Sequence, residues 1–173
     1  LSLDRPPWES LSFVGQAKGV AKEDLDEQIH HVMEVTRIAD VSQRLIKNLS
    51  KGYQQRVGIA QALLGDPEVV ILDEPTVGLD PKQIIEIRKL IGALRHEHTI
   101  ILSTHILQEV NAVCSTVAVI NKGKLAASGS VSDFTAAEGT VSKFMISVVG
   151  GSGKSEIQKV LQNVDGVRRV DFV

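Results

Sequence analysis

The sequence has few cysteines, few aromatic residues and no long apolar run, and each shortage excludes a class of protein. Its 173 residues include one cysteine, Cys114, which rules out a disulfide within the chain and indicates a reducing compartment. Aromatic residues make up 3% of the chain and hydrophobic residues 43%, so the core must be mainly aliphatic. No apolar stretch of 18 residues is present, and we therefore expect no membrane-spanning segment.

The chain also lacks an excess of charge of either sign. Its 19 Lys and Arg residues oppose 21 Asp and Glu residues, which gives a formal net charge of −2. This balance gives no electrostatic reason to expect a nucleic-acid partner or binding to an anionic membrane surface. The length allows one ordinary domain, or one domain with a small appendage.

What the sequence does contain is a short apolar run, residues 69–72, that ends on two carboxylates, Asp73 and Glu74. A continuous apolar run predicts a strand buried on both faces of a parallel sheet, and ligands collect at the carboxyl ends of such strands. Adjacent strand residues point in opposite directions, so the two carboxylates can act separately. One can hold Mg²⁺, directly or through water, and the other can orient and deprotonate a water molecule.

A helix start precedes this strand. Ser50 and Gly52 open a helical pattern that runs to Leu64. The first turn of a helix presents unpaired N–H groups and the positive end of the peptide dipole, which attract phosphate. Ser50 can add a hydroxyl donor, and Gly52 allows a close approach to the backbone. Most Ser-x-Gly helix starts are simple caps, so this pattern alone is weak.

Two further features follow the carboxylates. Asp80 is expected to cap a helix whose first residue is Pro81. A second apolar strand, residues 99–103, leads to His105, and we expect that strand to be buried and parallel as well. A histidine at a strand end can share a proton near neutral pH, which makes His105 a candidate functional residue.

Together these motifs resemble the ATP-binding subunit of ABC transporters. The corresponding motifs are the ABC signature at 49–56, Walker B with the catalytic Glu at 69–74, the D-loop at 78–80 and the switch histidine at 103–105. Four motifs in the family's order and spacing make the resemblance specific over about residues 8 to 129. Lys51 and Tyr53 depart from the usual Leu-Ser-Gly-Gly-Gln. Similar variants occur in exporters with separate membrane subunits, close to the gliding-motility transporters.

The resemblance implies a role for each motif in binding and hydrolysing ATP with Mg²⁺. Asp73 would hold Mg²⁺, through water; Glu74 would activate the attacking water, and His105 would contact the γ-phosphate. The residues implied to contact ATP across an interface with a second nucleotide-binding subunit, of like or unlike sequence, are Ser50, Lys51, Gly52, Gln54 and Asp80. A transmembrane permease would be the other partner, which would place the chain at the cytoplasmic face of the cell membrane.

The resemblance also implies an α/β architecture, part of the RecA-like parallel sheet of a P-loop NTPase. We expect an ABC helical subdomain with the signature at 1–60, the C-terminal half of the RecA-like core at 61–129, a linker, extended or helical, at 130–140 and a small β-α-β module at 141–173. In these parts the pattern predicts helices over 11–19, 24–35, 38–46, 82–94 and 106–113, and a hairpin around residues 121–123. The module is expected to place a helix, 157–161, between strands at 144–149 and 167–173.

No Gly-x-x-x-x-Gly-Lys-Ser/Thr sequence precedes residue 49. The resemblance therefore implies that the sequence starts after the family's glutamine loop, and that the chain alone binds ATP poorly. The alternative is a truncated, non-catalytic module that supplies only a signature or a docking surface. A soluble ABC ATPase of DNA repair or translation is disfavoured, because the chain has neither heptad repeats nor a basic stripe.

Three other patterns resemble binding motifs but do not meet their requirements. Residues 150–155 contain Gly-Lys-Ser, but a phosphate loop requires Gly where Val148 stands, so a flexible turn is the favoured interpretation over an anion site. The pair His30 and His31 has no accompanying carboxylate or cysteine cluster, which favours a solvated or half-buried pair over a metal site. In residues 96–98 the His-Glu-His sequence lacks the later His of a helical zinc motif, so a polar loop is expected.

Overall fold

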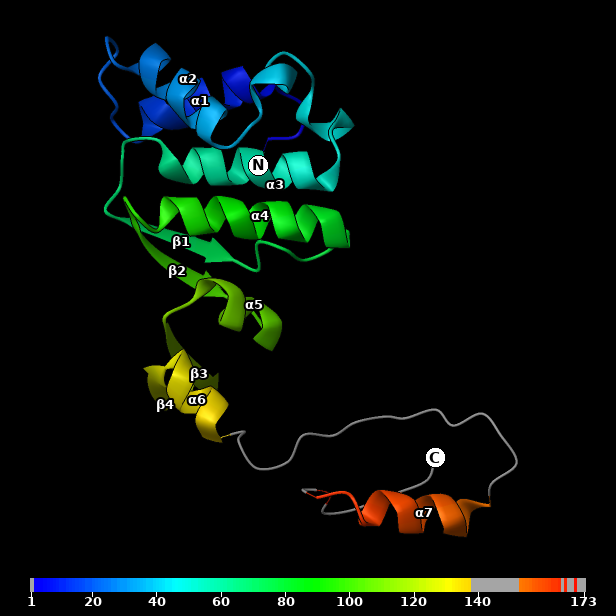
Figure 1. The fold of residues 1–173 in the computed structure, drawn as a ribbon. Helices are drawn as coiled ribbons and strands as arrows, with labels where there is room; N and C mark the ends of the chain where they lie inside the picture. Colours follow the sequence, from blue (N-terminus) through cyan, green and yellow to red (C-terminus); the bar gives the residue numbers. More distant parts are fainter. Residues whose placement is uncertain (1, 138–152, 166, 168–169, 171–173) are drawn as a thin grey trace. The chain divides into compact units, whose positions relative to one another are not determined.

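The computed structural model describes residues 2–137, 153–165, 167 and 170. Two compact units are distinguished, Leu1–Ala136 and Ala137–Val173. The described elements, in chain order, are α1 (Pro7–Ala17), α2 (Leu25–Val35), the 3-10 helices η1 (Ala39–Val41) and η2 (Ile46–Asn48), α3 (Lys51–Leu63), β1 (Val69–Asp73), α4 (Pro81–Leu94), β2 (Thr99–Ser103), α5 (Leu107–Val113), β3 (Thr116–Asn121), β4 (Lys124–Ser130), α6 (Val131–Ala137) and α7 (Lys154–Gln162) (Figure 1). None of the described helices is long and apolar enough to cross a membrane.

The helices α1, α2 and α3 pack against one another around an aliphatic core. Helix α2 shows the pattern most clearly, because its buried residues recur at helical spacing along one face. These residues are Leu25, Ile29, Val32 and Met33. The helices predicted over 11–19 and 24–35 are thereby confirmed.

The helix predicted over 38–46 is wrong, because this segment forms only the short 3-10 helices η1 and η2. Arg37 has a left-handed φ of 56° at the end of α2 and turns the chain there. Farther on, the backbone N–H of Ile46 donates to the carbonyl of Arg5 at 3.0 Å rather than to a carbonyl one turn earlier. Ile38 and Ile46 are fully buried. The apolar residues of this segment are therefore explained by burial in the core and do not indicate a helix.

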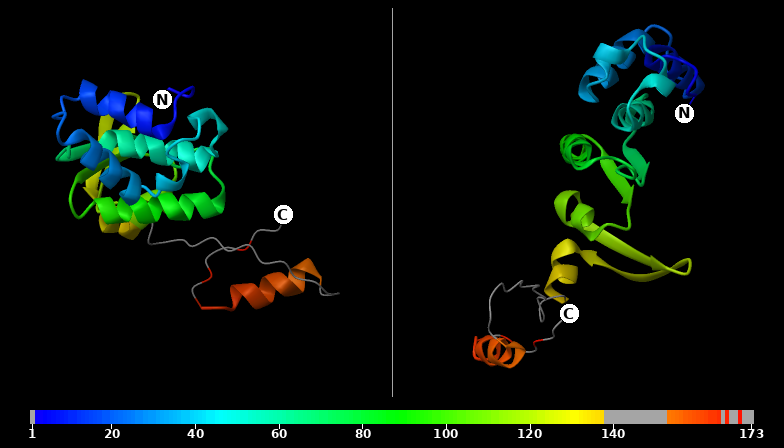
Figure 2. Two further views of the ribbon diagram at one scale, coloured as in Figure 1. Left: turned by 90° about the horizontal axis from the view of Figure 1, so that it is seen from above. Right: turned by 90° about the vertical axis from the view of Figure 1, so that its right-hand side faces the viewer.

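Strands β1 and β2 pair in parallel, with Asp73 opposite Ser103 at their carboxyl ends. Parallel pairing is as predicted, but burial on both faces is wrong for the described residues. Along β1, Leu72 is 6% exposed whereas Ile71 is 69% exposed. The second view in Figure 2 shows α3 and α4 on one side of the strands, which explains why only alternate side chains are covered.

Strands β3 and β4 form the predicted antiparallel hairpin, closed at Asn121 and Lys124. The two residues between them, Lys122 and Gly123, have φ of 49° and 73°, as a tight hairpin turn requires. Helix α6 begins directly after β4.

In the C-terminal unit, α7 contains the helix predicted over 157–161. The strand predicted at 144–149 lies outside the described residues, and so does that at 167–173 apart from Val167 and Val170. Most of the described part of the predicted linker at 130–140 forms helix α6, while the predicted domain boundaries stay predictions.

Candidate functional site

The carboxyl ends of β1 and β2 bring together the acidic and histidine residues singled out in the sequence. Ser103 joins the two strand ends, because its hydroxyl donates to Oδ1 of Asp73. The backbone N–H of Glu74 in turn contacts the Ser103 hydroxyl oxygen at 3.0 Å and the Ser103 carbonyl at 3.2 Å. Sequence reasoning missed this role of Ser103, although a hydroxyl opposite a strand-end carboxylate in a parallel pair was the available signal.

Glu74 and His105 form a direct pair at this edge. Nδ1 of His105 lies 2.8 Å from Oε1 of Glu74, and the two side chains are 72% and 35% exposed. Glu74 has a left-handed φ of 45°, an unfavourable backbone conformation for a residue with a side chain that is characteristic of functional sites. The hydrogen bond to Glu74 and its negative charge raise the pKa of His105 above the ordinary 6.5.

The second carboxylate oxygen of Glu74, Oε2, is buried and has no hydrogen-bond partner among the described residues. Buried polar atoms are nearly always paired, so an oxygen in this state is suited to accept a hydrogen bond from a water molecule or another ligand. Its neighbour Asp73 is exposed, and its Oδ1 already accepts from Ser103.

The donor set fits Mg²⁺. Within residues 2–137 and the described part of the C-terminal unit, no group of three or more His, Cys, Asp and Glu side chains is arranged to hold a metal ion. Mg²⁺ does not require such a group, because it is commonly held by one or two carboxylates together with water and substrate phosphate. Asp73, exposed at the carboxyl end of β1, provides one carboxylate of that kind.

At the start of α3, Ser50 is exposed to solvent, whereas the side chain of Gln54 is engaged with its own chain. Ser50 is exposed, and its hydroxyl oxygen accepts the N–H of Tyr53 at 3.4 Å as an N-cap. Gln54 points back into its own chain, where Nε2 donates to the carbonyls of Ile46 and Leu49 at 3.1 Å each. The structure therefore leaves Ser50 accessible to a ligand and uses the Gln54 amide to hold the preceding loop.

Lys51 and Gly52 connect the start of α3 to the loop before α4 and to the first turn of α4, respectively. Gly52 is buried, and a Cβ at this position would lie 2.8 Å from Cδ of Gln83. The close approach that Gly52 allows is thus made by Gln83. Nζ of Lys51 lies only 2.7 Å from where a Cβ of Gly78 would be.

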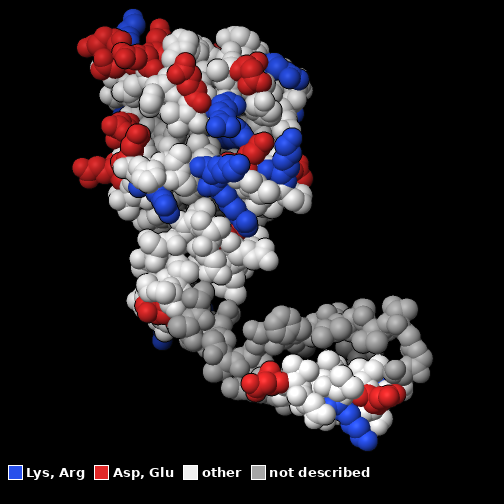
Figure 3. All heavy atoms as spheres, in the orientation of Figure 1, with Lys and Arg blue, Asp and Glu red and all other residues white. Residues whose placement is uncertain are grey.

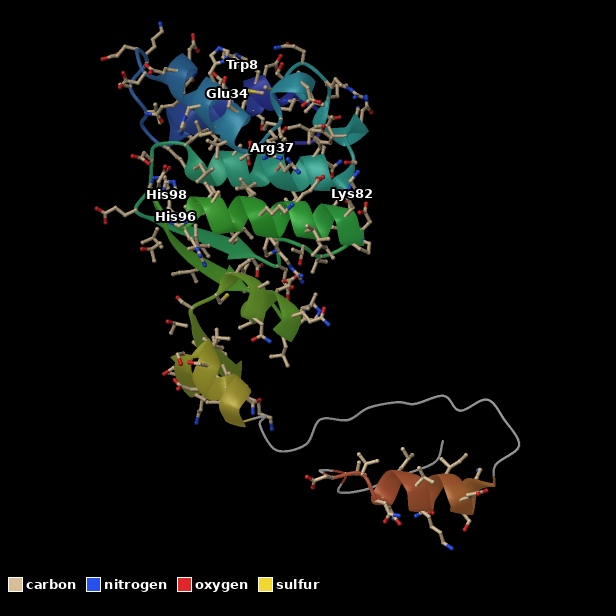
Figure 4. All side chains as sticks on the ribbon, in the orientation of Figure 1. Trp8, Glu34, Arg37, Lys82, His96 and His98 are labelled. Carbon is tan, nitrogen blue, oxygen red and sulfur yellow. The ribbon has the colours of Figure 1, made fainter. Side chains whose placement is uncertain are left out.

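Asp80 caps α4 as predicted, accepting the N–H of Gln83 at 2.9 Å, and Pro81 is the first helical residue. Figure 4 labels Lys82 at this end of α4, beside the start of α3, and His96 and His98 at the opposite end. In Figure 3, Lys and Arg side chains lie together over α3 and α4. Positive side chains near helix starts add to the attraction for phosphate.

Glu109 is the residue that sequence reasoning missed most plainly. It is 1% exposed, and its carboxylate accepts hydrogen bonds from the hydroxyls of Thr76 and Thr104. Nη2 of Arg88 lies 3.8 Å from Oε1 of Glu109. An acidic residue on the short helix after His105, next to the apolar Val110, was the signal that could have revealed it.

The remaining candidates take other roles or lie partly outside the described residues. The ring of His30 packs edge-on against Trp8 with centroids 4.8 Å apart. Nδ1 of His98 lies 2.8 Å from the carbonyl oxygen of Pro67. Of residues 150–155, only the last three are described, and Gly153 is the N-cap of α7.

Comparison with known proteins finds similarity to the family that the motifs resemble. The family model described as ABC transporter matches residues 7–77. An uncharacterized ABC transporter ATP-binding protein of Synechocystis sp. is 36% identical over 129 residues, which cover 73% of this chain and 36% of that protein. The uncharacterized ABC transporter ATP-binding protein YhcH of Bacillus subtilis is 44% identical over 115 residues, 65% of this chain and 36% of YhcH.

Relatives with a named transport role are also similar. The methionine import ATP-binding protein MetN of Streptococcus thermophilus is 36% identical over 135 residues, which cover 77% of this chain and 38% of MetN. The chain thus spans between a third and two fifths of the length of each of these three relatives, at 36%, 36% and 38%.

The fold has a counterpart among solved structures. The structure of cbiO1 from Clostridium perfringens, described as part of the ABC transporter complex cbiONQ, superposes with a TM-score of 0.70 at 30% sequence identity. The match covers 78% of this chain and 55% of the cbiO1 chain. The matched part of the chain is therefore similar in sequence to ATP-binding proteins of ABC transporters and shares the α/β fold of cbiO1.

Proposed function

We propose that the chain acts in an ABC transporter as the ATP-binding and ATP-hydrolysing subunit. The observation that carries this proposal is the contact between Glu74 and His105, which lie 2.8 Å apart beside Asp73 at the carboxyl ends of two parallel strands. A carboxylate, a proton-sharing histidine and a second carboxylate for Mg²⁺ are the groups that hydrolysis of a phosphoanhydride needs in one place.

In this proposal two subunits share each ATP. Ser50 and the start of α3 contact the γ-phosphate of a nucleotide held by the second subunit, because a helix start offers N–H groups and positive potential. Glu74 orients the attacking water and accepts its proton, and His105 stabilises the charge that develops on the γ-phosphate. Asp73 holds Mg²⁺, directly or through water, and the bound ion neutralises phosphate charge. Asp80 contacts the second subunit and so links the two nucleotide sites across the interface.

Phosphoryl transfer also needs a phosphate-binding loop, and the 173-residue sequence contains no Gly-x-x-x-x-Gly-Lys-Ser/Thr. We infer that protein outside these residues, in the same polypeptide or in another, supplies that loop. The apolar face of the β1–β2 pair supports this inference. Val69, Ile71 and Ile101 are exposed there, and apolar patches of this kind commonly mark a contact surface.

The direction of transport and the partners are part of the proposal. We assign export, with a separate permease, because Lys51 and Tyr53 match the signature variants of that branch, close to the gliding-motility transporters. MetN, which is named as an import protein, is 36% identical to this chain, so the assignment of export rests on the signature residues and not on the relatives. A permease partner would hold the chain at the cytoplasmic face of the membrane, as one of two like or unlike nucleotide-binding subunits.

The test is substitution of Glu74 by Gln in the native protein, purified with the subunits that accompany it. Mg-ATP binding should be retained, while turnover falls by about 100-fold or more, because a general base is lost. Glu68→Gln is the matched control, since Glu68 is exposed at the opposite end of β1. Normal turnover in Glu74→Gln would reject the assignment of the base.

A second candidate function is that of a non-catalytic module which supplies only its signature or a docking surface. The absence of a phosphate-loop sequence favours it. Isothermal titration of the chain by itself with Mg-ATP, set beside turnover of the native protein, separates the two functions. Turnover that depends on Glu74 supports the ATPase, and weak binding combined with no turnover supports the module.

A further inference from the structure

A single buried carboxylate lies between the two segments that carry Glu74 and His105. Glu109, on α5, is 1% exposed. Its Oε1 accepts from Oγ1 of Thr76, and its Oε2 accepts from Oγ1 of Thr104 at 2.7 Å. Each oxygen of one carboxylate is thus bonded to a different segment of the site.

Both threonines stand next to the reacting groups. Thr76 follows Glu74 by two residues and is itself buried, at 4% exposed. Thr104 directly precedes His105, and its Oγ1 also accepts the backbone N–H of Ile106 at 3.1 Å. The hydroxyl of Thr104 therefore fixes the turn on which His105 is carried, and Glu109 fixes that hydroxyl.

The environment of Glu109 shows that its carboxylate holds neighbouring side chains in place and does not bind a nucleotide or metal ion itself. A buried carboxylate is costly unless hydrogen bonds and a positive charge compensate it, and here two hydroxyls and the guanidinium of Arg88, at 3.8 Å, do so. Because the side chain is enclosed, it cannot reach a nucleotide at the open edge of the strands. Any effect on hydrolysis must pass through Thr76 and Thr104.

We propose that Glu109 is a positioning residue, which sets the separation of Glu74 and His105 by holding Thr76 and Thr104 on one carboxylate. The inference rests on the proposed function for its effect on hydrolysis, whereas the geometric part concerns only this chain. The two hydrogen bonds from the threonine hydroxyls connect the loop that follows β1 to the loop that follows β2. Losing either contact lets one of the two reacting groups move relative to the other.

The first test is kinetic and uses the native protein with its accompanying subunits. Thr76→Val and Thr104→Val remove the hydroxyls with little change in size, and Glu109→Gln removes the charge. Each should lower kcat by about 10-fold to 100-fold, the order that a displacement of about 1 Å costs, with KM for ATP changed less than about twofold. The double variant Glu109→Gln/Thr104→Val should be less impaired than the product of the single effects, because the charge of Glu109 and the hydroxyl of Thr104 belong to one contact.

The second test does not need turnover. The imidazole of His105 is titrated by NMR, with its signal assigned by comparison with His105→Asn. The charged groups that raise the pKa of His105 are Glu74 and Glu109, so Thr104→Val is the decisive variant because it leaves both charges in place. Its titration midpoint should fall from the raised value toward 6.5 as Glu74 and His105 separate. Gln108→Ala, an exposed neighbour on α5, should leave the midpoint unchanged.

The outcomes separate this inference from the proposed function. A native protein without ATP turnover, combined with a lowered midpoint in Thr104→Val, rejects the ATPase and keeps the positioning role. Normal kcat and an unchanged midpoint in both threonine variants reject the positioning role. If Glu109→Gln does not fold, as thermal unfolding would reveal, the two threonine variants decide the question.

Discussion

Nδ1 of His105 lies 2.8 Å from Oε1 of Glu74, although the two residues are 31 positions apart in the sequence. Each follows a strand of the same parallel pair, so the register of β1 and β2 determines their contact. The consequence is a proton-sharing pair held at an open edge of the protein, where a nucleotide could reach it.

The first prediction concerns the titration of His105. Its pKa is raised by the hydrogen bond and charge of Glu74, so Glu74→Gln should lower its titration midpoint toward 6.5. Because the raised value belongs to the folded state, protonated His105 stabilises the fold. This stabilisation is complete below pH 6.5 while Glu74 is ionised, and it is lost as the pH rises through the raised value.

NMR of the His105 ring and thermal unfolding across that pH range measure both effects. His30 serves as an internal control, because it lies on α2 among the N-terminal helices. A midpoint of His105 that does not respond to Glu74→Gln would contradict the pair.

The second prediction concerns Gly52, whose missing side chain makes room for Gln83. In a Gln83→Ala background, Gly52→Ala should raise the free energy of unfolding by up to about 1 kcal/mol, because Ala is the better helix former. In the wild-type background the same substitution should gain less or lose stability, because the new Cβ meets Gln83. Urea unfolding of the wild type, the two single variants and the double variant measures the coupling energy between Gly52 and Gln83. An equal effect of Gly52→Ala on stability in both backgrounds would exclude the contact.

The third prediction concerns the two faces of β1. In the chain by itself, Leu72→Ala should cost about 2 to 5 kcal/mol, whereas Ile71→Thr should cost no more than about 0.5 kcal/mol. The reason is that Leu72 is 6% exposed and Ile71 is 69% exposed. In the native protein, where we propose that this face is covered, Ile71→Thr should cost distinctly more. The same small loss in both settings would show that the face stays open.

The fourth prediction concerns the cap of α4. Asp80→Ala removes the acceptor for the N–H of Gln83 and should lower the free energy of unfolding by about 1 kcal/mol. Asp80→Asn keeps an acceptor oxygen and should be close to neutral in stability. If Asp80 also acts between subunits, Asp80→Asn should still reduce turnover. Equal destabilisation by both substitutions would argue against the cap.

The sequence was sufficient for the features that depend on order along the chain. The apolar run before Asp73 and Glu74, the strand before His105 and the Asp80–Pro81 helix start each have a local signature. Parallel pairing followed from two such strands joined through a helix. These elements are enough to place the candidate site at one edge of the sheet.

Features that depend on the choice of partner could not be predicted in the same way. Periodicity identifies Ile38 and Ile46 as buried but does not reveal that the N–H of Ile46 pairs with Arg5. The composition of β1 predicts an apolar strand, yet whether Ile71 is covered depends on which elements lie across it. The inward turn of Gln54 likewise depends on the carbonyls that the preceding loop exposes.

The contact of Lys51 with Gly78, and of Gln83 with Gly52, makes the start of α3 and the approach to α4 one continuous surface. Ser50 and Asp80 lie on that surface and are both exposed. In the proposed dimer a second chain would meet both residues in a single docking event. A nucleotide bound in this interface could then leave only when the whole interface opens. Nucleotide release and dissociation of the two subunits would therefore occur together.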